Sequence, residues 1–272
     1  DLLSAESILE VHRAEHGEDP DYLTGLSWLA RGAFLLQDFA RAERYADDVR
    51  ARCSKAIAAG ARLEDDRALE TALGAALEVQ AQLLERKSGA RAAAARLRRD
   101  LEAIPGPVSL RSRLNKRINM MTLAGSPAPD LAIEDSIGEK PPSLASLKGR
   151  PVVLFLWAEW CGDCKSQAAT LARARARYAP DGVQFIALTR YYDPPDVRPA
   201  EKERVAGAWK ANYADVGTIP IVLSAASMER YGGSSTPTFV FIDGAGIVQR
   251  YTPTRLTEAE FDRALEAILG AR

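Results

Sequence analysis

The chain has 272 residues, a length that suits two domains better than one small core. Hydrophobic residues make up 47% and charged residues 27%, the usual balance of a globular protein. The 36 basic and 37 acidic residues leave a net charge of −1, so there is no electrostatic case for binding nucleic acid or an anionic membrane. The longest apolar run, residues 152–158, is far shorter than the roughly 20 residues of a membrane helix.

The first 104 residues predict an all-α region, because long Ala, Leu, Arg and Glu stretches show no strand-like alternation. Apolar residues between 26 and 49 recur at helical spacing on both sides of a turn near Gln37-Asp38. A second helical pair is predicted over residues 67–87 and 90–103, interrupted by Ser88-Gly89.

The small and apolar residues between Leu29 and Ala46 are spaced as in a tetratricopeptide repeat, a helical unit that stacks into solenoids. A plain helical bundle is the alternative, because two pairs are fewer than a solenoid usually needs.

A further helix over residues 110–123 leads into residues 124–129, where Gly, Ser and two Pro mark a boundary. We therefore expect a helical domain at 1–124 and a second domain at 125–272.

The second domain alternates between short apolar runs and helical segments. Buried strands are predicted at 152–157 and 183–189, and a hairpin is predicted from 239–242 and 247–251 around the turn 243–246. Helices are predicted at 163–178, about 200–213, and 258–269. This alternation indicates an α/β sheet with helices on both faces.

Cys161-Gly-Asp-Cys164 follows the first buried strand directly and opens the next helix. A helix N-terminus presents free N–H groups and a partial positive charge, so a thiolate at Cys161 is stabilised there. The spacing lets the two sulfurs join, so the pair can cycle between dithiol and disulfide. Half of a zinc site is the alternative, but the second domain offers no further Cys or His ligand.

The segment Trp157–Lys165 resembles the thioredoxin active site, with Asp in place of the usual Pro. The chain is similar in particular to TlpA-type thiol–disulfide oxidoreductases. Three further segments carry this resemblance in order: Gly125–Asp130, Ser143–Val152, and Ser235–Asp243 followed by Gly246. The resemblance covers about residues 125–272 and does not extend to the helical region.

The resemblance implies a thioredoxin fold, with Cys161 as the exposed attacking thiol and Cys164 as the resolving thiol. It also implies a cis peptide bond before Pro237, which would expose the Thr236 backbone to a substrate chain; an ordinary turn proline is the alternative. Trp160 is expected to shield the disulfide and contact substrates rather than fill the core.

This sequence departs from the family at three positions. The buried acid usual six residues before the first Cys is replaced by Phe155, and the Glu often found three residues after the second Cys is Gln167. The helix-kinking proline two residues later is Ala169, which predicts a straighter helix.

Asp163, between the two cysteines, is the candidate for tuning their acidity. It could serve as acid or base, or it could simply complement the helix dipole. As a carboxylate it disfavours a nearby thiolate, and the sequence offers no cation between the cysteines to offset it, with Lys165 expected to face solvent. We therefore expect a reductant rather than a strong oxidant.

Other chemistry-bearing residues are few. His12-Arg-Ala-Glu-His16 matches a zinc-protease pattern, but no third ligand is identifiable, and two solvated helix residues are the alternative. Cys53, in an Ala-rich helix, is expected to be a small buried side chain.

These observations predict a thiol–disulfide oxidoreductase without cofactor or metal, acting on protein substrates and served by an upstream electron donor. Because the family it resembles works outside the cytoplasm, we expect a periplasmic, secreted or membrane-tethered protein whose leader has been removed. The alternative is a helical module that binds a protein partner, with the redox domain secondary. A peroxidase is less well supported, because the Pro and Thr that precede a peroxidatic Cys are not seen.

Overall fold

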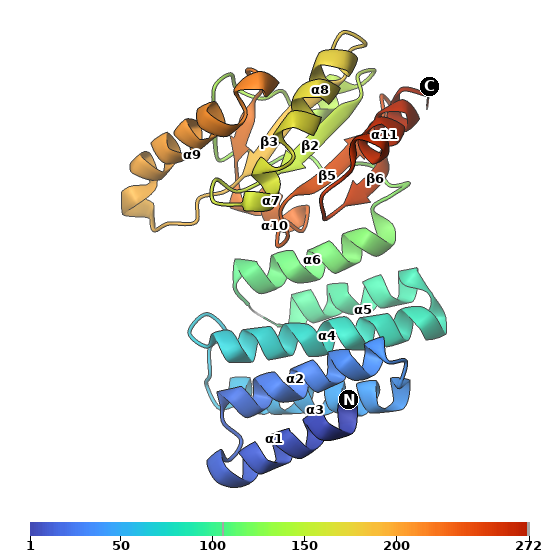
Figure 1. Ribbon diagram of the computed structural model, residues 1–272, viewed down its shortest axis with the longest axis vertical. Coiled ribbons are helices and arrows are strands. Elements are labelled where there is room, and N and C mark those ends of the chain that lie inside the picture. The colour runs from blue at the N-terminus through green and yellow to red at the C-terminus, as the bar shows by residue number, and fades with distance from the viewer. Residues whose placement is uncertain (105, 271–272) are drawn as a thin grey trace. The chain divides into compact units, whose positions relative to one another are not determined.

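The computed structural model describes residues 1–104 and 106–270 (Figure 1). The chain forms two compact units, Asp1–Ile118 and Asn119–Arg272, and the division falls within helix α6 (Val108–Thr122). The first unit is all-helical and the second is α/β with a thioredoxin-like fold, so both predicted fold classes are confirmed. A domain boundary after Ala124 stays a prediction.

Most helices of the first unit begin at an aspartate. Its helices are α1 (Leu2–His16), α2 (Pro20–Leu35), α3 (Phe39–Ala58), α4 (Arg67–Ser88) and α5 (Ala90–Ala103), followed by the first part of α6. The carboxylates of Asp1, Asp19, Asp38 and Asp66 accept hydrogen bonds from backbone N–H groups in the first turns of α1 to α4. Each of these bonds satisfies a donor that the helix itself leaves free.

Small side chains form the contacts inside this unit. Helices α2, α3 and α4 pack against one another, and α4 packs against α5. Ala30, Ala33, Ala42 and Ala46 are fully buried at these contacts, where they let the helices approach closely. The predicted turn between α2 and α3 is confirmed, and Gln37 adopts a φ of 62° there. The resemblance to a tetratricopeptide repeat stays a prediction.

The second unit is built on a sheet with strand order β1-β4-β3-β2-β5-β6. The strands are β1 (Asp135–Ile137), β2 (Val152–Leu156), β3 (Gln184–Thr189), β4 (Ile221–Leu223), β5 (Thr238–Ile242) and β6 (Val248–Thr252). β2, β3 and β4 run parallel to their neighbours in that trio, whereas β1, β5 and β6 pair antiparallel. Its helices are α7 (Gly162–Lys165), α8 (Ala168–Tyr178), α9 (Arg198–Asn212), α10 (Ala225–Arg230) and α11 (Glu258–Gly270).

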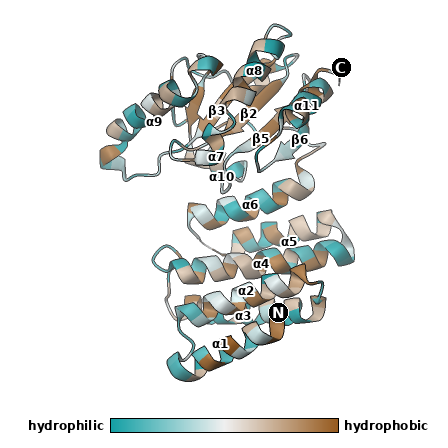
Figure 2. Ribbon diagram, in the orientation of Figure 1, coloured by the Kyte–Doolittle hydropathy of each residue, from teal (hydrophilic) through white to brown (hydrophobic). Residues whose placement is uncertain are grey.

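Both faces of this sheet are covered, as predicted. Successive residues of a strand point to opposite faces, so Phe155 joins the core under α8, α9 and α11 while Leu154 joins the core on the other face. The central strands are accordingly apolar on both sides, which Figure 2 shows as brown ribbon along β2 and β3. The second core also includes Leu123 and Tyr231.

The strands predicted from apolar runs are all present, but β1, β4 and α10 were not predicted. β1 and β4 have three residues each and α10 has six. Such short segments are below the window in which hydrophobic periodicity can be read.

The prediction of one continuous helix over 163–178 is wrong. The chain instead forms the short α7, is interrupted at Ser166-Gln167, and continues as α8. At the interruption the Ser166 hydroxyl donates to the Asp163 carbonyl (2.8 Å), and the Gln167 N–H donates to the Cys164 carbonyl (3.1 Å), three residues back instead of four. Local side-chain and 3₁₀-type bonds thus compete with the helical ladder, and no proline is required.

No helix within residues 1–104 and 106–270 is both long and apolar enough to cross a membrane.

Candidate active site

Cys161 and Cys164 form a disulfide at the start of α7, with Cα atoms 5.2 Å apart. Cys161 is the N-cap of this helix, and the Cys164 N–H lies 3.0 Å from its Sγ. The buried strand β2 ends only a few residues earlier, which holds the pair just beyond the carboxyl end of this central strand. A backbone N–H aimed at a sulfur favours its thiolate form once the bond is reduced.

The expectation that Cys161 is exposed is wrong for the disulfide form. Cys161 is 5% exposed and Cys164 is fully buried. Of the two sulfurs, an incoming thiol can therefore reach only Cys161 without rearrangement of the site.

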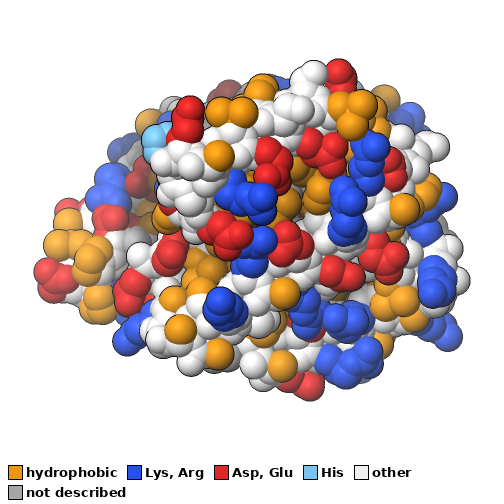
Figure 3. Space-filling view, turned by 90° about the horizontal axis from the view of Figure 1, so that it is seen from below, with side chains coloured by type: hydrophobic (Ala, Val, Ile, Leu, Met, Phe, Trp, Pro, Cys, Tyr) orange, Lys and Arg blue, Asp and Glu red, His pale blue; other side chains and the backbone are white. Residues whose placement is uncertain are grey.

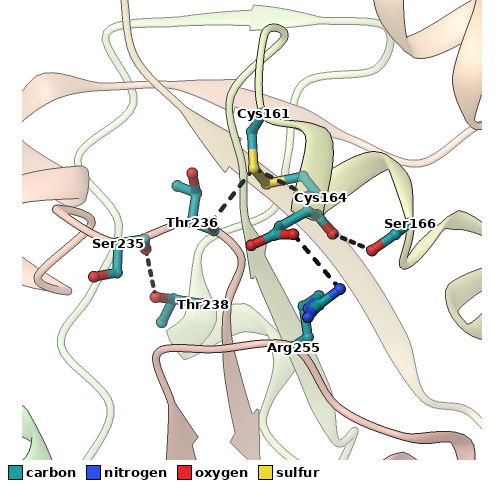
Figure 4. The surroundings of a disulfide bond; sticks show 8 residues. Cys161, Cys164, Ser166, Ser235, Thr236, Thr238 and Arg255 are labelled. Atoms are coloured by element: carbon teal, nitrogen blue, oxygen red, sulfur yellow. Dashed lines mark hydrogen bonds and ion pairs between the residues drawn. A yellow bond between two sulfur atoms is a disulfide. The ribbon is translucent and has the colours of Figure 1, made fainter.

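The peptide bond between Thr236 and Pro237 is cis, as the resemblance implies. The Thr236 carbonyl oxygen lies 3.4 Å from Cys161 Sγ, and the two meet at the centre of Figure 4. The Thr238 hydroxyl donates to the Ser235 carbonyl (2.7 Å), which ties the two sides of Pro237 together. This loop therefore lies directly beside the disulfide.

Trp160 is 61% exposed beside Cys161, so it is not a core residue. Its ring meets the ring of Tyr192 edge-on, with centroids 5.6 Å apart. The Arg190 guanidinium lies over the Tyr192 ring, 4.3 Å from its centroid. Neither Tyr192 nor Arg190 was predicted as a site residue, because both follow β3 and no local motif marks them.

Asp163 is exposed on α7, and its Oδ1 lies 3.6 Å from Arg255 Nη1. Arg255 belongs to the loop between β6 and α11 and is labelled in Figure 4. No cation lies between the cysteines, as the sequence indicates, but in the folded chain Arg255, from 92 residues further along, approaches this carboxylate. Lys165 is exposed, as expected.

The layer beneath the disulfide is aromatic. Phe155, at the position of the family's buried acid, stacks with Trp157 and Phe239 at centroid distances of 6.5 and 5.2 Å. Tyr213 packs edge-on against both Phe155 and Trp157. Burial raises the pKa of Tyr213 above its usual range, and among the described residues neither its hydroxyl nor Trp157 Nε1 has a hydrogen-bond partner.

Gln167 occupies the position of the second family acid and is buried. Its Oε1 accepts a hydrogen bond from the Leu256 N–H (2.9 Å), one residue after Arg255. The side chain at this position is therefore an anchor for the loop before α11.

The remaining candidates lie in the helical unit. His12 Nε2 is 2.9 Å from Asp19 Oδ1, and the His12 and His16 rings lie with centroids 4.8 Å apart. Among the described residues no group of three or more His, Cys, Asp or Glu side chains could hold a metal ion. Cys53 is fully buried, as expected, and its Sγ lies 3.9 Å from the Leu69 carbonyl oxygen.

Comparison with protein-family models gives a match to Redoxin over residues 123–268, more than half of the chain. The chain belongs to the redoxin family. The matched region contains the disulfide, the cis-proline loop and Arg255, and it leaves the helical unit outside. The predicted thioredoxin-like redox domain is confirmed, and its TlpA-type character is consistent with this family.

Two similar proteins are named as a thioredoxin-like protein and a thiol-disulfide oxidoreductase. The thioredoxin-like protein YneN of Bacillus subtilis is 29% identical over 144 residues, which cover 52% of this chain and 78% of that protein. The thiol-disulfide oxidoreductase ResA of Oceanobacillus iheyensis is 30% identical over 74 residues, which cover 26% of this chain but only 38% of that protein. Among solved structures, a thiol-disulfide isomerase from Corynebacterium glutamicum is 16% identical, with a TM-score of 0.46 over 54% of this chain and 98% of that one.

Proposed function

We propose that this protein reduces disulfides in protein substrates through Cys161 and Cys164. The observation that carries the proposal is the disulfide at the N-terminus of α7, with one sulfur partly accessible and the Thr236 carbonyl beside it. A helix start and a sulfur pair are the elements that a dithiol needs for disulfide exchange, and the Thr236 backbone beside them is proposed to hold the substrate chain.

The reaction begins with the reduced protein. The Cys161 thiolate attacks one sulfur of a substrate disulfide, forming a mixed disulfide, and the other substrate sulfur leaves as a thiolate. Cys164 then attacks Cys161 Sγ, which releases the second substrate thiolate and forms the disulfide seen here. A donor dithiol of another protein must reduce the pair before the next cycle.

Three neighbours are assigned to substrate binding. Trp160 supplies an exposed apolar surface next to the attacking sulfur, and the Thr236 backbone, held by Pro237, faces the same sulfur. Asp163 is assigned to tuning the thiolate, because it is the ionisable side chain between the cysteines. A carboxylate there opposes thiolate formation, which favours a reductant over a strong oxidant.

The helical unit is proposed to contact a partner protein. Its surface has exposed large apolar side chains, including Trp28 (60%) and Leu35 (80%). On the face drawn in Figure 3, basic and acidic side chains are interspersed rather than gathered into a field of one sign, which is typical of protein contact more than of nucleic-acid binding. The site of action is proposed to be outside the cytoplasm, in the periplasm or tethered to a membrane, on the strength of the TlpA-type resemblance.

The test uses the whole chain with Cys53→Ala, so that every adduct forms on the redox pair. In this background the protein is expected to reduce insulin with a dithiol donor. Cys164→Ser is expected to accumulate mixed disulfides with substrate, because the resolving sulfur is gone, whereas Cys161→Ser should not. Equal trapping by both variants would show that the roles assigned to Cys161 and Cys164 are wrong. Failure of the parent protein to reduce insulin would refute the reductase function.

A further inference from the structure

The loop between β3 and α9, residues 190–197, is fixed by a buried carboxylate. Glu201 in α9 is 1% exposed. Its Oε1 accepts a hydrogen bond from the Tyr192 N–H (2.7 Å), and its Oε2 accepts one from the Asp193 N–H (3.2 Å). A carboxylate is buried at large cost unless it is hydrogen-bonded, so this pair of bonds defines where the loop lies.

A second set of contacts joins this loop to the turn that carries Cys161. Arg204 Nη2 donates to Asp193 Oδ2 (2.7 Å), and Arg204 Nε donates to Glu159 Oε1 (2.8 Å). Glu159 lies two residues before Cys161 in the sequence. One arginine thus neutralises two acids and bridges the loop to the active-site turn.

The third contact is aromatic and begins at the residue next to Cys161. Trp160, Tyr192 and Arg190 form a continuous row, indole against phenol and phenol against guanidinium; we call these three residues the recognition row. Arg190 has no carboxylate within ion-pair distance among the residues that the structure describes, in contrast to Arg204. The row therefore ends in a cation whose charge is not matched by a neighbouring acid.

We propose that the recognition row selects protein substrates that carry a carboxylate side chain close to the reactive cysteine. The substrate carboxylate pairs with the Arg190 guanidinium, which can bind it through two parallel hydrogen bonds, while the flanking apolar part of the substrate lies on Trp160. Glu201 is a positioning residue, because it holds Tyr192 and through it the whole row. This inference rests on the proposed reductase function.

The test compares two oxidised peptides that differ only in a Glu or a Gln two residues from the cysteine. The full-length reduced protein is expected to show a kcat/KM about fivefold to tenfold higher for the Glu peptide, and high salt should shrink this ratio. Arg190→Gln is expected to bring the ratio close to one. Arg263→Gln, an exposed arginine on α11, is the matched control and should leave the ratio as in the wild type.

Glu201→Gln tests the positioning role, because it keeps the size of the side chain but turns one acceptor into a donor facing the loop. The ratio is expected to fall through a higher KM for the Glu peptide, while the reduction potential of the Cys161–Cys164 pair is unchanged. If Glu201→Gln fails to fold, the Arg190→Gln result alone decides the proposal. If the wild-type protein reduces both peptides with nearly equal kcat/KM, the proposed role of the recognition row is wrong, whereas the reductase function stands. If neither peptide nor the uncharged bis(2-hydroxyethyl) disulfide is reduced, the reductase function itself fails.

Discussion

Arg255 faces Asp163 across the start of α7, with Nη1 and Oδ1 3.6 Å apart. The carboxylate between the two cysteines is therefore partly balanced by a cation from the loop before α11. Both side chains are more than half exposed, so solvent and salt screen the pair. The effect of Asp163 on the redox pair is accordingly smaller than an isolated carboxylate would produce.

The two charges predict opposite shifts of the reduction potential. Asp163→Asn removes a charge that opposes the Cys161 thiolate, so the potential should become more oxidising. Arg255→Gln leaves the carboxylate unbalanced, so the potential should become more reducing. An exposed pair contributes about 0.2–1 kcal/mol, which corresponds to about 5–20 mV for a two-electron couple. Equilibration with glutathione at low salt measures these shifts.

The double variant and a distant acid serve as controls for this prediction. Asp163→Asn combined with Arg255→Gln should return the potential close to the wild-type value. Asp181→Asn, an exposed acid after α8, should leave it unchanged. Shifts of the same sign in the two single variants would contradict the pairing.

A fragment that begins at Asn119 should fold and reduce a generic disulfide without the helical unit. Every redox residue lies beyond that point, and Asn119 Nδ2 donates to the Arg230 carbonyl (3.0 Å) within the second unit. A fragment that begins at Gly125 loses this bond and buried Leu123, so its free energy of unfolding should be about 2–4 kcal/mol lower. Urea denaturation of both fragments measures the difference. An inactive but folded fragment from Asn119 would show that the helical unit takes part in the chemistry.

Gln167 is expected to matter for stability more than for chemistry. Gln167→Leu leaves the buried Leu256 N–H without its acceptor, and the free energy of unfolding should fall by about 1–3 kcal/mol. Gln167→Glu keeps an acceptor at the same place and restores the family acid, so it should introduce an additional ionisation into the pH profile of disulfide exchange. Identical pH profiles for wild type and Gln167→Glu would mean that this position does not exchange protons with the pair.

Cys53 should make the folded state less stable at alkaline pH. Burial raises the pKa of the Cys53 thiol to about 12, whereas a thiol in the unfolded chain ionises near pH 8.5. The unfolded state therefore releases a proton that the folded state retains. The resulting stability is fully present below about pH 8.5 and is lost as the pH rises toward 12, by about 3 kcal/mol at pH 11. Unfolding of wild type and Cys53→Ala between about pH 8 and 11 should show a loss that is larger in the wild type by about this amount.

The centre of the site could be predicted from sequence because its signals are local. The buried strand, the Cys-x-x-Cys at a helix start and the Thr236-Pro237 pair are each encoded in a few consecutive residues. The residues that surround the centre are different. Arg255 reaches Asp163 from 92 positions away, and Glu201 acts through the backbone of Tyr192, so each depends on the folded chain.

The prediction of the helix after Cys164 failed for a related reason. Substitution of the family proline by Ala169 indicated a straighter helix. The helix is instead interrupted at Ser166-Gln167, where the Ser166 hydroxyl bonds the Asp163 carbonyl and the Gln167 side chain bonds Leu256 in a distant loop. Periodicity describes which face of a helix is buried and carries little information on such bonds. The aspartate caps of α1 to α4, in contrast, are local signals from which the helix starts could have been predicted.

The aromatic floor under the disulfide governs how the redox pair exchanges protons. Phe155, Trp157 and Phe239 supply no carboxylate beneath the sulfurs. The two protons that accompany the two electrons therefore come from the solvent around Cys161. A two-electron, two-proton couple shifts by about 59 mV per pH unit while both thiols are protonated. The driving force of this dithiol therefore follows the acidity of its surroundings directly, and the same molecule is a weaker reductant in an acidic compartment than in a neutral one.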